Sequence, residues 1–171
     1  MLLRVVLALV ALVIVGGLAG GCYVRSELRA SLPAVEGTRT LPGLSAPVTV
    51  ARDALGVPAI TGASRADVAR ALGFVHAQDR FFQMDLQRRQ PAGELSALVG
   101  ERAFDADAQA RVHMSRRVAE QAYARTGPEW RATLDAYTAG VNAGLADLGA
   151  PPFEYLMLRT TPEPWKPEDS I

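Results

Sequence analysis

The sequence is short of cysteine and histidine, with one cysteine at position 22 and two histidines, His76 and His113. A single cysteine cannot close an internal disulfide bond, so the sequence neither requires nor excludes an oxidising compartment. The two histidines lack the paired spacing of metal ligands, and a protein metal site needs several clustered ligands. We therefore expect residues 1–171 to hold no metal and no cofactor by themselves.

The charges show no excess of either sign, because 18 basic side chains balance 18 acidic ones. Zero net charge gives no electrostatic reason to expect nucleic acid or another polyanion as a partner. Zinc-finger spacing and basic aromatic platforms are missing as well. The sequence therefore predicts that nucleic acid is not a partner. Its apolar content of 49% and its 171 residues fit roughly one globular domain.

A nucleophile elbow of the form Gly-x-Ser-x-Gly is also missing. None of the seven serines follows a glycine: Ser26, Ser31, Ser45, Ser64, Ser96, Ser115 and Ser170. Ser64 is better explained as a helix cap, and Cys22 by targeting. A Ser-His-Asp triad assembled from distant positions stays open as a minority alternative. Because no serine occupies a strained-turn context, we predict no catalytic residue in this chain.

Six carboxylates could offer a pair for acid–base chemistry: Asp79, Asp85, Glu94, Glu101, Asp105 and Asp107. Helical spacing favours ion pairs with arginine instead. An exposed contact of Asp85 with Arg88 or Arg89 would contribute only ~0.2–0.5 kcal/mol. A partly buried cluster of Asp79, Arg80 and Arg88 would fix helix orientation, and breaking it would cost ~3–5 kcal/mol. Next to this cluster, His76 is predicted to be a hydrogen-bonded structural histidine.

The N-terminus has the pattern of a targeting segment. Residues 5–24 carry no charge, residues 5–15 are continuously apolar, and Arg4 precedes them. About 20 apolar residues also suffice to span a bilayer. Residues 1–24 are therefore a cleaved signal peptide or a retained transmembrane anchor, with Arg4 and the α-amine inside. Acylation of Cys22 is the third alternative, although Ala19 replaces the bulky residue expected there. All three alternatives predict a periplasmic or other extracytoplasmic location.

The remaining chain divides into a linker, residues 25–46, and a partial domain, residues 47–171. The predicted elements are a β-hairpin from residues 48–50 and 57–61, and helices over residues 64–90, 94–99, 105–125, 128–148 and 151–158. Ser64 suits a helix start, with Asp67 able to reach back to it. Pro91 predicts an end at Gln90, and Pro128 suits a first helical turn. The fold class is mostly α with a short N-terminal β-hairpin.

Five blocks, in this order and spacing, resemble the N-terminal part of the α chain of the penicillin acylase family, which belongs to the N-terminal nucleophile hydrolases. They are Val50–Asp53 with Gly56–Pro58, Gly73–Arg89, Gly93–Gly100, Tyr137–Ala143 and Pro162–Asp169. Ala59 departs from the family, which often has histidine at this position. The resemblance implies a parent fold of four layers, an αββα sandwich, of which residues 47–171 form a truncated part.

The resemblance also implies a chemistry. Family precursors cut themselves to expose a serine at the β-chain N-terminus, which attacks linear carbon–nitrogen amide bonds of N-acyl compounds. The α-amine of that serine serves as base, since its reference pKa is ~7.7–8. The full-length family also implies a structural calcium ion. We expect the nucleophile, the oxyanion donors and the calcium ligands to lie outside residues 1–171. The implied partners are the rest of the α chain, the β chain and an N-acyl amide substrate, and the fragment alone is expected to be inactive.

A different class of protein, a membrane-tethered helical interaction module without catalytic activity, is the alternative. The two hypotheses differ in folding. An independent module predicts cooperative unfolding of residues 26–171. A fragment predicts a weak transition or none, because apolar helix faces that normally pack on further chain would be exposed.

Overall fold

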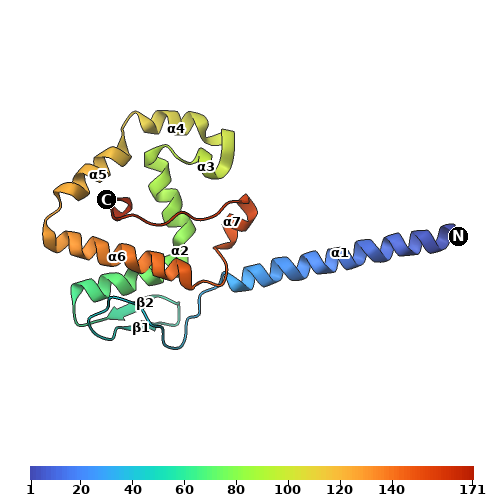
Figure 1. The fold of residues 1–171 in the computed structure, drawn as a ribbon, viewed down its shortest axis with the longest axis horizontal. Helices are drawn as coiled ribbons and strands as arrows, with labels where there is room; N and C mark the ends of the chain where they lie inside the picture. The colour runs from blue at the N-terminus through green and yellow to red at the C-terminus, as the bar shows by residue number, and fades with distance from the viewer.

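The computed structural model describes residues 1–171, and its first element is a long helix that stands clear of the rest (Figure 1). This helix, α1, spans Leu2–Ala30 and has no buried residue. It is long and apolar enough to cross a membrane, as is also true of many signal sequences. The helix continues beyond residue 24 to Ala30, so it includes the first residues of the segment predicted as a linker.

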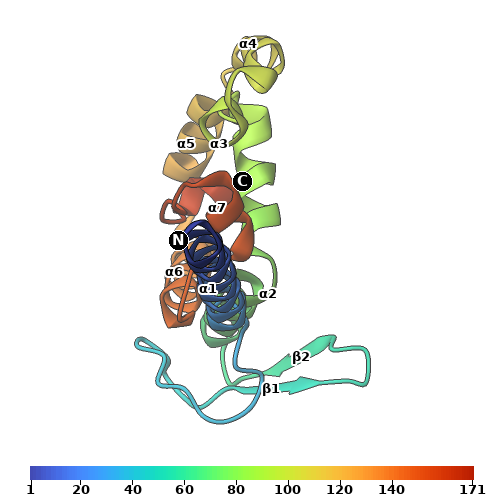
Figure 2. The same ribbon diagram turned by 90° about the vertical axis from the view of Figure 1, so that its right-hand side faces the viewer.

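The predicted β-hairpin is present. Strand β1, Thr49–Arg52, pairs antiparallel with β2, Pro58–Thr61. The turn between them depends on Asp53, whose Oδ1 atom accepts a 2.9 Å hydrogen bond from the backbone N–H of Val57. Gly56 completes the turn at a φ of +80°, a conformation that favours glycine. The hairpin lies against the start of the next helix (Figure 2).

Helix α2, Arg65–Ala92, begins as predicted. The Ser64 hydroxyl accepts a 3.1 Å hydrogen bond from the backbone N–H of Asp67. The Asp67 carboxylate reaches back to the Ser64 hydroxyl at 2.8 Å and accepts a second bond, also 2.8 Å, from the backbone N–H of Ser45. Asp67 therefore fixes the end of the linker to the first turn of the helix.

The predicted end of this helix at Gln90 was wrong. The helix continues through Pro91 and ends at Gly93, which has the left-handed φ of 69°. The Gly93 N–H bonds to the Gln90 carbonyl, and the Glu94 N–H bonds to the Arg89 carbonyl. These two bonds close the last turn without the N–H that proline lacks. The helix is also not continuous, because Arg80 has the non-helical φ of −155°.

A single helix over residues 105–125 was also predicted, and the structure contains two. The elements of this region are α3 (Ser96–Val99), the 3₁₀ helix η1 (Gly100–Ala103), α4 (Phe104–Arg111) and α5 (Ser115–Arg125). Met114 separates α4 from α5 with a φ of +51°, which places it in the left-handed region. Asp107 on α4 accepts hydrogen bonds from the backbone N–H groups of Leu95 and Ser96 at 2.9 and 2.7 Å. It thereby caps α3.

Helix α6, Pro128–Asp147, starts at its predicted proline and lies along the first half of α2 (Figures 1 and 2). Glycine allows the two backbones to touch. A Cβ atom added to Gly140 would lie 1.9 Å from the Arg70 carbonyl oxygen, and one added to Gly144 would lie 2.2 Å from that of Phe74. The α2–α6 pair is the largest helix contact of the fold.

The chain then forms α7, Phe153–Leu158, crosses α2 in an extended path and ends in the 3₁₀ helix η2, Pro167–Ser170 (Figure 1). The core lies where α2, α3, α6, α7 and this final segment meet. Its buried members are Ala77, Phe81, Met84, Leu98, Val141, Tyr155 and Trp165. The predicted class, mostly α with a short hairpin, is confirmed.

Candidate functional site

A cleft of about 1120 Å³ opens between the second half of α2, helix α5 and the final segment. Most of the residues that line it are polar or charged, and they include His76, Asp79, Arg80, Gln83, Arg88, His113, Arg116 and Asp169. One wall of the cleft is a network of buried ion pairs.

Asp85 is the centre of this network and is fully buried. Its Oδ1 atom accepts hydrogen bonds from Arg88 Nε at 2.7 Å and from Arg89 Nε at 2.8 Å. Its Oδ2 atom accepts a 2.7 Å hydrogen bond from the Tyr155 hydroxyl. Burial raises the pKa of Tyr155, and the neighbouring Asp85 raises it further, so this phenol keeps its proton. The predicted pairing of Asp85 with both arginines is confirmed, but the predicted exposed setting was wrong, because all three side chains are buried.

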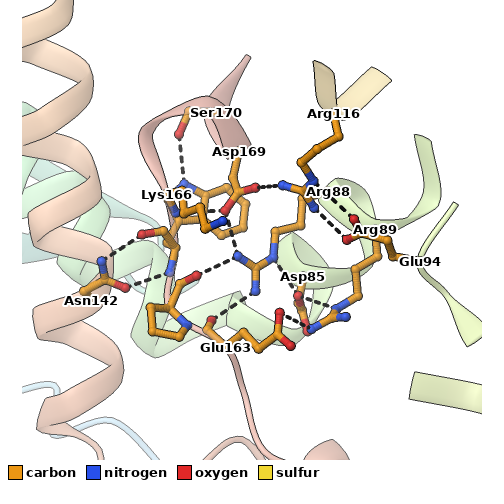
Figure 3. Close-up of polar contacts among 12 residues, drawn as sticks. Asp85, Arg88, Arg89, Glu94, Arg116, Asn142, Glu163, Lys166, Asp169 and Ser170 are labelled. Carbon is orange, nitrogen blue, oxygen red and sulfur yellow. Dashed lines mark hydrogen bonds and ion pairs between the residues drawn. The ribbon is translucent and has the colours of Figure 1, made fainter. Parts of the chain in front are cut away.

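Arg88 connects α2 to the final segment (Figure 3). Its Nη1 atom donates to the Pro164 carbonyl at 2.8 Å and to Asp169 Oδ2 at 2.7 Å, while Nη2 donates to the Glu163 carbonyl at 3.0 Å. The guanidinium carbon lies 5.1 Å from the ring centre of Trp165. One planar side chain therefore holds the final segment at Glu163, Pro164 and Asp169.

Asp169 extends the network from Arg88 to α5. Its Oδ1 atom accepts a hydrogen bond from Arg116, which also pairs with Glu94 at 2.7 Å. Burial opposes the charge on Asp169, but donation from the Lys166 backbone N–H and from Arg88 outweighs it, and the pKa stays below its usual range. Arg116 holds its proton firmly, because the hydrogen bond to Glu94 raises its pKa. Both groups are therefore charged at neutral pH.

The predicted cluster of Asp79, Arg80 and Arg88 does not form. Asp79 pairs instead with Arg52 of the hairpin through two hydrogen bonds of 2.9 and 2.8 Å. Arg80 is exposed and has non-helical backbone angles. This break in the helix separates Asp79, which faces the hairpin, from Asp85, which faces the core.

The histidine prediction is confirmed for His76, whose Nδ1 atom lies 3.0 Å from the Tyr137 hydroxyl. Burial lowers the pKa of His76, and nearby Arg80 lowers it further, so the ring is neutral at pH 7. His113 lies on the cleft wall. The serine hydroxyls that form hydrogen bonds do so with the Leu28 carbonyl, the Asp67 carboxylate and the Trp165 indole N–H, and none pairs with a histidine.

This network of ion pairs is suited to holding the helices and the final segment together, and it is not suited to proton transfer. Asp85 and Asp169 each accept from two or more donors and have arginine partners, so neither is a free base. No three His, Cys, Asp or Glu side chains come together in a way that could hold a metal ion.

The sequence of residues 47–171 matches the model of one protein family, described as penicillin amidase. The chain belongs to this family. The penicillin acylase 2 proenzyme of Pseudomonas sp. strain SE83 is 48% identical over 148 residues, which cover 86% of this chain and 19% of that relative. The acyl-homoserine lactone acylase QuiP of Pseudomonas putida is 36% identical over 151 residues, which cover 82% of this chain and 17% of that relative.

A solved structure agrees with this membership. The thermostable penicillin G acylase from Alcaligenes faecalis superposes with a TM-score of 0.65 at 29% sequence identity. The match covers 72% of this chain and 68% of that chain. The folded part of the chain that follows α1, called the body below, therefore has the fold of a penicillin amidase segment.

Most residues of the network lie in blocks that carry the resemblance to the family. Four of the five sequence blocks contribute Asp85, Arg88 and Arg89, then Glu94, then Asn142, then Glu163, Trp165 and Asp169. Arg116 and Tyr155 join the network from outside the blocks. Asn142 accepts from the Trp165 N–H at 2.8 Å and donates to the Trp165 carbonyl at 2.9 Å. Sequence reasoning missed the roles of Asn142 and Asp169. Their positions inside the family blocks were the available signal.

Proposed function

We propose that the chain is the N-terminal part of an acylase precursor that hydrolyses amide bonds of N-acyl compounds. Within that enzyme, residues 47–171 support the active site and do not perform its chemistry. The observation that carries the proposal is the convergence of the family blocks on the buried network around Asp85, in which every carboxylate already has arginine or N–H partners.

The length of the relatives supports a role as part of a larger protein. The chain spans about a fifth of the penicillin acylase 2 proenzyme, 19% of its length. The partners we propose are the rest of the same precursor, namely further α chain and the β chain. The nucleophilic serine and the oxyanion donors belong to that remainder, and so do the ligands of the calcium ion predicted from the family resemblance.

The names of the relatives bear on the substrate class. One is a penicillin acylase and another is an acyl-homoserine lactone acylase. An N-acyl amide is the substrate class we propose for this protein. Selection between two acyl groups depends on the lining of the acyl pocket, where one methylene group changes selectivity by only about 1–3 kcal/mol.

We further propose an extracytoplasmic, periplasmic location. The support for it is α1, an apolar N-terminal helix with no residue buried against the body. Such a helix can act as a signal peptide or as an anchor, and either use delivers residues 47–171 to the far side of the membrane.

A chimera tests the proposed function. In the penicillin acylase 2 proenzyme of Pseudomonas sp. strain SE83, the segment that aligns with residues 47–171 is replaced by those residues; this protein is called the 47–171 chimera below. We expect it to mature and to release acid from N-acyl substrates, a penicillin and an acyl-homoserine lactone among them. A chimera that folds and matures but cleaves neither class of amide would contradict the proposal.

A further inference from the structure

Helix α7 carries an apolar face that the body does not cover. Phe153, Leu156 and Met157 are 44%, 37% and 75% exposed. Their spacing of three and four residues places them on one side of the helix. The opposite side holds Tyr155, which is 1% exposed and donates to Asp85 in the core. The buried network therefore fixes the direction in which the apolar face points.

This face lies beside the last turns of α1. Phe153 and Leu156 line a small hollow together with Glu27 of α1. The backbone N–H of Ala150, just before α7, donates a 3.1 Å hydrogen bond to the carbonyl of Ala30 at the end of α1. Both views show α7 next to the point where α1 leaves the body (Figures 1 and 2). The position of α7 along α1 is thus defined.

The sequence of α1 fixes where a bilayer would end along it. Residues 5–24 are uncharged, and 20 helical residues span about 30 Å, the thickness of the hydrocarbon layer. Tyr23 lies at the end of this run, where interfacial aromatic residues are enriched, and Arg25 follows. Glu27 lies three residues beyond Val24, or about 4.5 Å along the helix axis. The headgroup layer is about 5–7 Å thick on each side, so Glu27 lies within it.

We propose that the α7 face, formed by Phe153, Leu156 and Met157, rests on the lipid headgroups of the membrane that α1 spans. The α7 face lies at the same position along the α1 axis as Glu27, which is at the depth of the headgroups. The body therefore rests directly on the bilayer and is not separated from it by a linker. Insertion of such side chains at the boundary between headgroups and acyl chains is the usual behaviour of apolar faces on interfacial helices.

Charge agrees with a lipid partner. Arg25 and Arg29 extend from the same turns of α1, and Arg159 ends α7; all three are exposed, and they outnumber the two carboxylates of this region, Glu27 and Glu154, which are half-buried. Long cationic side chains next to an apolar surface reach phosphate groups at the interface and are attracted to an anionic membrane. The seating follows from the docking of α1 to the body, so it holds on whichever side of the membrane the body lies. It rests on the proposed retention of α1 as an anchor.

Spin labelling tests this seating in a second chimera, in which residues 1–171 replace the corresponding N-terminal segment of the penicillin acylase 2 proenzyme of Pseudomonas sp. strain SE83, so that the rest of the precursor is present. Met157→Cys and, as control, Val112→Cys are each made in a cysteine-free version of this chimera that includes Cys22→Ser, and are labelled with a nitroxide. Met157 and Val112 are equally open, at 75% and 76% exposed, and Val112 follows α4, away from α1. The proteins are inserted into vesicles of phosphatidylethanolamine and phosphatidylglycerol at a 3:1 ratio. Collisions of each label with oxygen and with a water-soluble nickel complex are then measured.

The label at position 157 is expected to show a severalfold higher oxygen-to-nickel collision ratio than the label at position 112. Equal ratios at the two positions would overturn the proposal, because both would then lie in water. Protection of position 157 from both reagents would also overturn it, because the face would then be covered by protein. Mass spectrometry reports whether residues 1–30 are retained, and their removal would contradict the seating while leaving the proposed amide hydrolysis unaffected.

Discussion

Arg88 and Asp169 form a hydrogen-bonded ion pair of 2.7 Å across 81 positions of sequence. The pair joins the second half of α2 to the last residues of the chain, and both side chains are almost inaccessible to solvent. Burial of two charges is favourable only when hydrogen bonds satisfy the remaining donors and acceptors. The carbonyls of Glu163 and Pro164 and the backbone N–H of Lys166 meet this need. The extended final segment is therefore held by polar contacts.

Replacement of Asp85 is predicted to be severely destabilising. Asp85→Asn removes the charge that faces Arg88 and Arg89, and removal of one partner from a buried ion pair costs about 3–5 kcal/mol. We expect a lower thermal midpoint and a lower yield of the mature 47–171 chimera. Asp79→Asn is the control, because Asp79 pairs with Arg52 near the surface, where a pair contributes about 1 kcal/mol or less. Equal losses in the two variants would show that the Asp85 pairs are not the stronger restraint.

Gly140 should not tolerate even one added carbon atom. In Gly140→Ala the new Cβ would lie 1.9 Å from the backbone oxygen of Arg70, so α6 must move away from α2. Overpacking of this kind costs about 1–3 kcal/mol or more. Gly127→Ser, at the cap of α6, has open space and should be neutral. The thermal midpoints of the two variants are compared with that of the parent 47–171 chimera. A Gly140→Ala chimera as stable as the parent would refute the close contact between α6 and α2.

The attachment of the final segment should weaken in acid. The folded state lowers the pKa of Asp169, so its contribution is present above the usual aspartate pKa of about 3.9 and is lost as the pH falls through the folded value. Hydrogen exchange of residues 160–171 in the chimera, corrected for the intrinsic effect of pH, should rise below about pH 4. Exchange within α6 is the internal reference for global unfolding.

The variant Asp169→Asn separates this effect from the titration of other carboxylates. It should exchange faster over residues 160–171 already at pH 7 and should lack the additional rise in acid. A rise that persists unchanged in Asp169→Asn would assign the pH dependence to another group, such as Asp107, whose pKa is also lowered because N–H donors outweigh the effect of its burial.

Residues 26–171 on their own are predicted to unfold over a broad range of temperature. Their main core cluster contains only seven buried hydrophobic side chains, while large apolar residues such as Val118, Trp130 and Phe104 are 58%, 58% and 59% exposed. A small core leaves little free energy to oppose the loss of conformational entropy. Calorimetry should show a weak transition or none. A sharp cooperative transition would favour the alternative of an independent helical module.

Local signals in the sequence identified the elements whose structure depends on neighbouring residues. The hairpin turn at Asp53 and Gly56, the cap at Ser64 and the start at Pro128 all depend on contacts within a few positions. The partners of Asp85 at positions 88 and 89 were predictable for the same reason, since they lie one helical turn away.

Features set by distant contacts could not be predicted in this way. The partner of Asp79 is Arg52, 27 positions earlier, and the partner of Arg88 is Asp169. The helix end at Gly93 was missed because the bonds that close the last turn bypass the missing N–H of Pro91. Met114 has a left-handed φ of 51°, and its sequence gives no signal of this conformation.

The most direct test of the central claim, that this segment supports an active site located elsewhere in the precursor, is an amidase assay on purified residues 26–171. Phenylacetyl, penicillin and acyl-homoserine lactone amides are incubated with this segment and, in parallel, with the 47–171 chimera. We expect acid release by the chimera and none above background by the segment. Clear turnover by residues 26–171 alone would contradict it, because a catalytic centre would then lie within this chain.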